Sequence, residues 1–213
     1  MHMLHKIFAF VFLLSFAGIT AVAQNTDATS PYVFPEFVKS TVLQKNGGSV
    51  NALLNYNTIT QEMMFEQNGS RIVMDQGNTD TIYLGKRKFI PAKGVYLEKL
   101  TNTPAALYVQ LKNKAVLAQK GEKVNGVLSD VYKKNETEKA DHYAMKLPDS
   151  YRLLNDNKYW LQRGSDLIAL TNLKKIPGLF PKKEAEVARF IEENKTSLTI
   201  MEDMVKLVEF AGK

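Results

Sequence analysis

Alternation of apolar and polar residues along short runs is the feature that most constrains this chain. The clearest run lies at residues 50–57, where Val50, Ala52, Leu54 and Tyr56 alternate with Asn51, Leu53, Asn55 and Asn57. A period of two is that of a β-strand with one buried face. The middle of the chain is therefore expected to fold as strands.

A β-hairpin is predicted around Asn68-Gly69. Both residues tolerate the positive φ angles of a type I′ turn, whose twist matches that of the flanking strands. A two-residue loop also fixes the register. The expected cross-strand pairs are Phe65 with Ile72, Met63 with Met74, Glu66 with Arg71 and Met64 with Val73.

Further short runs of the same kind follow, separated by turn residues. The expected strands are Asp80–Leu84, Arg87–Ile90, Val95–Leu100, Ala105–Lys112, Ala115–Gln119, Val124–Tyr132, His142–Leu147, Lys158–Arg163 and Asp166–Leu170. Pro31–Lys45 is expected to pack across the domain, and Lys133–Asp141 to form a solvated loop. Regular short strands with turn signals favour an antiparallel meander, as a sandwich, a curved sheet or a barrel.

After Thr171 the period becomes helical. Two amphipathic helices are expected, one with Val187, Phe190, Ile191 and Asn194 on one face, the other with Met201, Met204, Val205 and Val208. Thr199 and Glu202 have the spacing of a capping box, and Gly212 is placed to end the second helix. The predicted class is α+β: one β-rich domain over residues 24–213, with its helical part at about 171–213.

Residues 1–23 have the pattern of a secretory signal peptide. Lys6 precedes the apolar run Ile7–Ile19, and the small residues Ala21 and Ala23 predict cleavage before Gln24. The alternative is a retained membrane anchor, which needs about 20 apolar residues. We expect an exported protein, periplasmic or secreted, that does not span a membrane after cleavage.

Composition excludes several kinds of chemistry. The chain has 213 residues and no cysteine, and His142 is the only histidine outside the predicted leader. Disulfide scaffolds and thiolate metal sites are therefore excluded, and one histidine is too few for the usual zinc, copper or non-haem iron sites. Asp141 and His142 would point to opposite faces of a strand, so they are poorly placed to act as a pair. No catalytic residue and no cofactor is expected, and the chain is not expected to be an enzyme.

A weak calcium candidate lies in one turn. Asp75, Asn78 and Asp80 crowd around Gly77. Calcium binds oxygen ligands, but this spacing is not that of an EF-hand. The alternative is a turn without a metal, since Asp and Asn side chains commonly bond to nearby backbone groups.

Basic residues outnumber acidic ones, 28 to 22, which gives a formal charge of +6. They cluster at Lys86-Arg87-Lys88, Lys133-Lys134, Lys174-Lys175 and Lys182-Lys183. Nucleic-acid binding needs basic residues gathered on one face with stacking aromatics, and these clusters are scattered, so no nucleic acid is expected as a partner. Lys86, Arg87 and Lys88 are candidates for contact with an anionic envelope surface. An ordinary solvated surface is the alternative.

Two stretches resemble a family of exported proteins of unknown function from Gram-negative bacteria. They are residues 50–57 leading to 62–65, and residues 80–91, taken together with the C-terminal pair of helices. The resemblance covers most of the chain after the leader and brings no catalytic residues with it.

Three functional hypotheses remain open. The first is an exported, non-enzymatic β-rich module of the cell envelope that binds another envelope protein or an anionic surface, or has a structural role. The second is a carrier that holds an apolar ligand such as a lipid in a curved sheet, with the helices as a lid. The third and weakest is a hydrolase with a carboxylate-based site.

Overall fold

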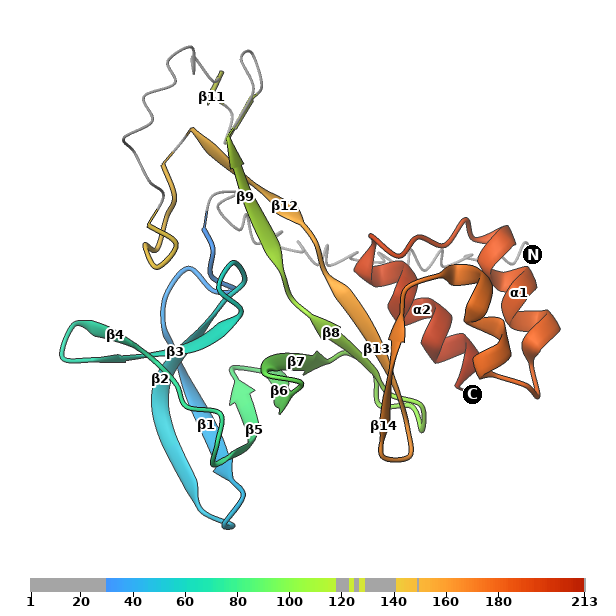
Figure 1. Ribbon diagram of the computed structural model, residues 1–213, viewed down its shortest axis with the longest axis horizontal. Helices are drawn as coiled ribbons and strands as arrows, with labels where there is room; N and C mark the ends of the chain where they lie inside the picture. Colours follow the sequence, from blue (N-terminus) through green and yellow to red (C-terminus); the bar gives the residue numbers. More distant parts are fainter. Residues whose placement is uncertain (1–29, 118–122, 125–126, 129–140, 149, 213) are drawn as a thin grey trace, which may run out of the picture.

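The computed structural model describes residues 30–117, 123–124, 127–128, 141–148 and 150–212. Strands make up most of its regular structure, and the two α-helices lie at the C-terminal end of the chain (Figure 1). The strands are β1 Val38–Gln44, β2 Ser49–Asn57, β3 Glu62–Gln67, β4 Ser70–Val73, β5 Thr79–Leu84, β6 Arg87–Ala92, β7 Val95–Lys99, β8 Leu107–Gln110, β9 Asn113–Leu117, β10 Lys123–Val124, β11 Val127–Leu128, β12 Tyr151–Asn155, β13 Lys158–Arg163 and β14 Asp166–Leu170. The helices are the 3₁₀-helices η1 Leu173–Lys175 and η2 Pro177–Leu179, and the α-helices α1 Glu184–Glu193 and α2 Met201–Ala211.

Ten strands form one antiparallel sheet in the order β14-β13-β8-β7-β6-β5-β1-β2-β3-β4. The order follows the chain from β5 to β8, but β1 lies between β2 and β5, which makes β4 an edge strand. The pairs β9–β12 and β10–β11 form two smaller sheets. The predicted α+β class, an antiparallel meander with two C-terminal helices, is confirmed. The large sheet is curved and is not closed into a barrel.

The predicted hairpin is confirmed in turn type and register. Asn68 and Gly69 have φ angles of 52° and 75°, as a type I′ turn requires. β3 and β4 pair Phe65 with Ile72, Glu66 with Arg71 and Met64 with Val73. Local turn chemistry is therefore sufficient to fix this part of the sheet.

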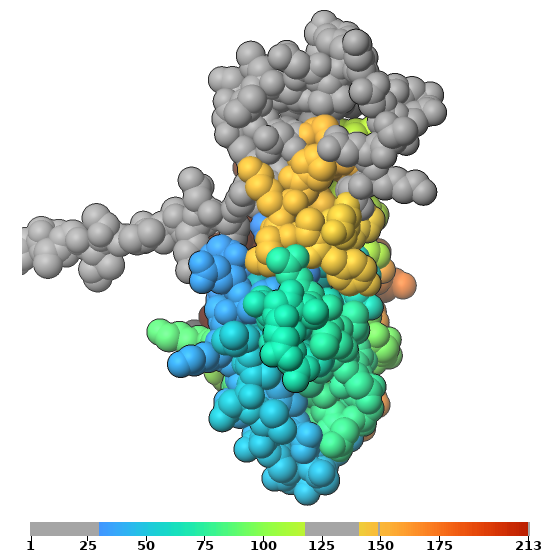
Figure 2. All heavy atoms as spheres, turned by 90° about the vertical axis from the view of Figure 1, so that its left-hand side faces the viewer, coloured from blue at the N-terminus to red at the C-terminus, as the bar shows by residue number. Residues whose placement is uncertain are grey.

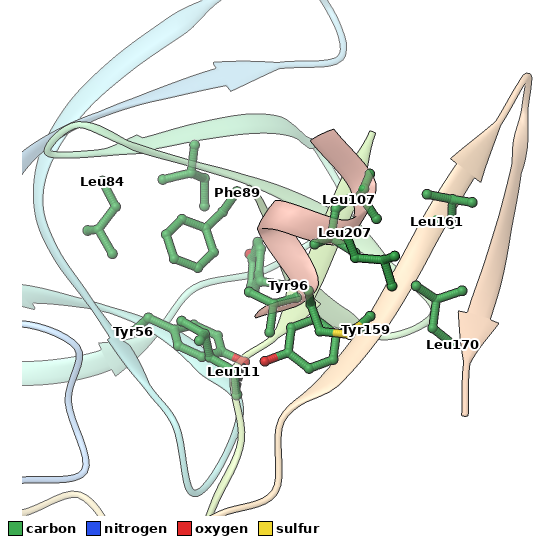
Figure 3. Packing of buried hydrophobic residues seen from close by; sticks show 14 of the residues in the cluster. Tyr56, Leu84, Phe89, Tyr96, Leu107, Leu111, Tyr159, Leu161, Leu170 and Leu207 are labelled. Carbon is green, nitrogen blue, oxygen red and sulfur yellow. Dashed lines mark hydrogen bonds between the residues drawn. The ribbon is translucent and has the colours of Figure 1, made fainter. Parts of the chain in front are cut away.

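One face of the sheet, which we call the inner face, holds the main core. Its fully buried side chains include Leu54, Tyr56, Leu84, Phe89 and Tyr159, several of which Figure 3 shows packed together. The sheet curls over this face, since the Tyr56 hydroxyl donates a hydrogen bond to the carbonyl of Leu111 at 3.2 Å. In Figure 3 the hydroxyl ends of Tyr56 and Tyr159 both point toward Leu111.

Both α-helices contribute to the same core. Their buried residues, Val187 in α1 and Met204, Leu207, Val208 and Ala211 in α2, belong to one cluster with the inner-face residues of β8, β13 and β14. The predicted amphipathic faces are confirmed, since Phe190, Ile191, Met201 and Val205 also pack against this cluster, except at Asn194, which is exposed and caps the end of α1. In Figure 1 the helices lie at the β13–β14 end of the sheet, away from β1–β4.

The predicted capping box at the second helix is wrong, whereas its predicted end is confirmed. α2 follows Ile200, and no side-chain hydrogen bond caps it. The Thr199 hydroxyl is instead hydrogen-bonded to the Ser197 hydroxyl at 2.8 Å, so it does not reach the first turn of the helix. Gly212 ends the helix, and its amide donates to the carbonyl of Val208 at 2.9 Å.

The predicted packed segment Pro31–Lys45 divides into two parts. Residues 38–44 form β1 within the sheet, whereas residues 31–37 lie alongside β2. There the Asn55 amide donates to the carbonyls of Phe34 and Glu36 at 2.8 and 3.0 Å, and its oxygen accepts from the Phe34 amide at 3.2 Å. The segment also pairs with β2 through a bridge between Tyr32 and Asn57, so the buried Asn55 adds side-chain hydrogen bonds where this pairing ends.

The predicted strand His142–Leu147 is wrong, because residues 142–146 form turns and bends and Leu147 has no regular structure. Side chains bind its carbonyls: the Asn57 amide donates to His142 at 2.6 Å, and Arg71 and Tyr32 donate to Tyr143 at 2.8 and 3.0 Å. Figure 2 shows this segment, in yellow, seated next to β3 and β4. The sequence analysis also missed β12, which pairs with β9.

Some predictions fall outside the described residues. These are the signal peptide at 1–23 with its cleavage site, nearly all of the loop Lys133–Asp141, and most of the strand Val124–Tyr132, of which residues 127–128 pair with 123–124.

Candidate functional site

The outer face of the sheet carries a row of basic and aromatic side chains. Strand pairing sets Tyr83 of β5 opposite Lys88 of β6, Lys88 opposite Lys99 of β7, Lys99 opposite Tyr108 of β8, and Tyr108 opposite Trp160 of β13. Side chains of direct cross-strand partners project from the same face, about 5 Å apart. We call these five residues the outer row.

Two aromatic rings of this surface are covered by ammonium groups. The Lys88 Nζ lies 5.9 Å from the centre of the Tyr83 ring. Lys93, in the turn between β6 and β7, places its Nζ 5.1 Å from the centre of the Trp160 ring. Cations at these distances are attracted by the electrons of the ring face. The two rings therefore help to fix the positions of the Lys88 and Lys93 ammonium groups.

An apolar floor supports the outer row. Leu97, Ala106 and Tyr108 are buried on the outer face, with Ile90, Ala92, Val95, Trp160 and Leu167 packed against them. The Tyr108 hydroxyl donates to the Gln162 side chain at 3.0 Å. Tyr83 is 41% exposed, so the row is buried near Tyr108 and open at its β5 end.

Acidic residues are missing from the outer-face positions of β6, β7, β8 and β13. Alternation from the outer row assigns Lys88, Ile90, Ala92, Val95, Leu97, Lys99, Tyr108, Gln110, Lys158, Trp160 and Gln162 to this face, and none is acidic. On β5, alternation assigns Thr81 and Tyr83 to this face, and the exposed Asp80, at a register shift, accepts a hydrogen bond from the Thr81 hydroxyl. Like charges directly opposite each other destabilise a sheet, yet Lys88 and Lys99 are such a pair. The Lys88–Lys99 pair thus lowers the stability of the sheet locally and favours the binding of an anion.

The structure does not bring Lys86, Arg87 and Lys88 together as one patch. Lys88 belongs to the outer row, and Lys86 is exposed in the turn between β5 and β6. Arg87 faces inward, where its guanidinium makes a two-pronged ion pair with the buried carboxylate of Glu98, with Nε 2.6 Å from Oε1. Arg87 is therefore engaged with the protein itself.

Sequence reasoning missed the other members of the surface. Lys93, Lys99, Tyr83 and Trp160 come together through strand register, and the basic clusters of the sequence did not include them. One signal was available: a two-residue turn at Gly85-Lys86 sets Tyr83 opposite Lys88.

The predicted calcium turn is held by hydrogen bonds. The Asp75 carboxylate accepts from the Gly77 amide at 3.0 Å, and Asp80 accepts from the Thr81 hydroxyl at 3.0 Å. The Lys45 ammonium donates to the carbonyl of Gly77 at 2.9 Å, and Asn78 offers its carbonyl to the Lys45 amide at 3.0 Å. Across the described residues, no three His, Cys, Asp or Glu side chains are grouped to hold a metal.

An open groove lies on the inner face at the β1–β4 end. Its volume is about 440 Å³. Its apolar lining is Val42, Val50, Ala52, Leu53, Leu54, Phe65 and Met74, and its polar lining is Gln44, Asn51, Glu66 and Gln67. Val50 is 49% exposed, so the groove presents apolar surface to solvent.

Comparisons with other proteins give no relative. No protein-family model, curated protein or solved structure matches the chain. In the part of the chain that the structure describes, no helix is both long and apolar enough to cross a membrane.

Proposed function

We propose that this protein is an exported, non-enzymatic binding module of the cell envelope that contacts an anionic partner through its outer face. The observation that carries the proposal is the Lys88–Lys99 pair, which is flanked by aromatic rings and has no acidic residue at the outer-face positions of β6, β7, β8 and β13. A like-charged pair costs stability in the isolated protein, and an anionic ligand removes that cost.

Export is supported by the signal-peptide pattern of residues 1–23. The expected mature chain begins at Gln24, which N-terminal sequencing of protein from intact producing cells would determine. A chain that retains residues 1–23 would contradict this part of the proposal.

Binding is tested by fractionating the producing cells. The protein should sediment with the envelope at low ionic strength and be released as salt screens the lysines. The double variant Lys88→Gln/Lys99→Gln should be released at lower salt. Its matched control is Lys182→Gln/Lys206→Gln, which removes the same charge from exposed positions near and on the helices.

Two results would contradict the binding proposal. One is a protein that stays in the soluble fraction at low salt. The other is equal release of both double variants, since this would make net charge, and not the outer face, the cause of envelope association.

A second candidate function is a carrier of an apolar ligand, favoured by the groove on the inner face. Its exposed Val50 and partly buried Phe65 offer contacts for a hydrocarbon chain, and its volume of about 440 Å³ is within the usual range for small-molecule sites. Native mass spectrometry of protein from an envelope fraction would detect a retained lipid. A bare protein mass would count against the carrier.

A further inference from the structure

We infer that the anionic partner of the outer face is the surface of a lipid bilayer, with Trp160 at the level of the headgroups. This inference rests on the proposed function and specifies its partner. The outer face requires a partner with an extended negatively charged surface that also accommodates aromatic rings. An anionic lipid bilayer has both properties.

The outer row has suitable dimensions and composition. It runs across five adjacent strands, from Tyr83 in β5 to Trp160 in β13. At a strand spacing of about 4.8 Å, the row extends about 19 Å. Lys93 and Lys158 are exposed beside it and add to the same face. Lysines beside Tyr and Trp are the side chains expected where a protein meets a membrane interface.

The placement of the lysines favours a lipid bilayer over a nucleic acid, whose bases stack on aromatic side chains. Nucleic acids bind aromatic platforms whose ring faces are open to bases. Here ammonium groups lie over Tyr83 and Trp160, at 5.9 and 5.1 Å from the ring centres. One face of each ring is therefore occupied by an ammonium group, and these ammonium groups can meet headgroup phosphates.

The indole of Trp160 has an unused donor. Its Nε1 hydrogen is buried and has no acceptor among the described residues. Tryptophan N–H groups normally find an acceptor, and headgroup phosphate and ester oxygens are acceptors.

Trp160 is the only tryptophan in the chain, so its fluorescence reports on this face alone. The probe is a vesicle of equimolar phosphatidylglycerol and phosphatidylcholine, titrated into the exported protein, whose mass is checked first. We expect a blue shift of the Trp160 emission, and quenching when the lipids carry bromine near the headgroup. Vesicles of phosphatidylcholine alone should give neither change.

Lysine variants test the role of the outer row. Lys88→Gln/Lys99→Gln should weaken partitioning into the anionic vesicles about 25-fold, since each lysine near such a surface contributes about fivefold. The control Lys182→Gln/Lys206→Gln should change it less than threefold. Circular dichroism of both variants establishes that each is folded.

The outcomes separate this inference from the proposed function. The protein could associate with the envelope through the outer row and yet show no emission shift and no bromine quenching of Trp160. This result would overturn the inference that the partner is a bilayer and leave an anionic polysaccharide or protein as the partner. Preferential binding of single-stranded nucleic acid with Trp160 quenching would overturn it as well. If the unmodified protein binds neither the envelope nor the anionic vesicles, the proposed function itself is overturned.

Discussion

Arg87 and Lys88 are neighbours in the sequence but lie on opposite faces of β6. Arg87 pairs with Glu98 over Phe89 on the inner face, whereas Lys88 stands opposite Lys99 on the outer face. Successive strand side chains alternate between faces, so a run of three basic residues cannot form one patch on a strand. The face on which each residue lies, and therefore its environment, follows from its alternating position along the strand.

Gly69 is the residue whose backbone most directly tests the predicted hairpin. It has a φ of 75°, and no heavy atom lies within 4 Å of where a Cβ would be. Gly69→Val should therefore destabilise the fold by about 1–2 kcal/mol through backbone strain alone. Urea unfolding measures the loss.

The matched control is Gly178→Val. Gly178 also has open space around it, but its φ is not in the positive range. Equal unfolding midpoints for the two variants would show that the turn at Asn68-Gly69 relaxes without cost.

At the scale of elements, the residue period and turn residues of the sequence predicted the local structure well. They did not predict which distant strands pair. The hairpin turns, most strand positions and the two helices follow from period and turn chemistry. The insertion of β1 between β2 and β5, and the pairing of β8 with β13, depend on contacts between distant segments. The segment 142–147 was misread because its apolar pattern resembles a strand, while side chains satisfy its carbonyls.

The segment at residues 31–37 should depend on Asn55. Asn55→Ala would leave the carbonyls of Phe34 and Glu36 without their buried donor. We expect a loss of about 2–4 kcal/mol in stability and faster hydrogen exchange in this segment.

A control for this change lies on the same strand. Asn51 is exposed and accepts one hydrogen bond, from the Thr41 hydroxyl at 2.9 Å. Asn51→Ala should cost about 0.5 kcal/mol or less. If both variants behave alike, Asn55 does not hold the segment.

At the scale of the whole molecule, the core on the inner face contains the buried phenols of Tyr56, Tyr96 and Tyr159. Burial raises the pKa of Tyr96 to about 12 and also raises the pKa of Tyr56 and of Tyr159. The folded protein thus keeps these protons to higher pH than the unfolded chain, whose tyrosines titrate near about 10. Stability is fully present below about pH 10 and falls as the pH rises toward about 12.

Alkaline unfolding tests this dependence. The urea midpoint should fall between about pH 9 and about pH 11, and the shift for Tyr96 alone corresponds to at most about 3 kcal/mol when complete. Tyr96→Phe should make the fall smaller, whereas Tyr83→Phe, at an exposed ring, should leave it unchanged. A fall of the same size in all three proteins would exclude Tyr96 as a cause.

The candidate site was predictable only in part for the same reason as the fold. Lys88 was identified because it lies in a basic run, but Lys99 and Trp160 carry no local signal of their own. Their meeting requires the register of four strand pairs, and each register is set by a separate turn or connection. A one-residue slip in any of them would move a member to the other face.

The position of β1 between β2 and β5 has a consequence for the chain during synthesis. β1 and β2 can pair as soon as both have been made, but the other side of β1 lacks its neighbour until Thr79–Leu84 follows. During that interval the growing chain presents a seven-residue strand, VKSTVLQ, with open backbone groups. In the finished protein β1 is covered on both sides, and this end of the sheet terminates at the four-residue β4 with its arginine, a poorer template for aggregation. The risk of misassembly is therefore concentrated in the nascent protein, before β5 arrives.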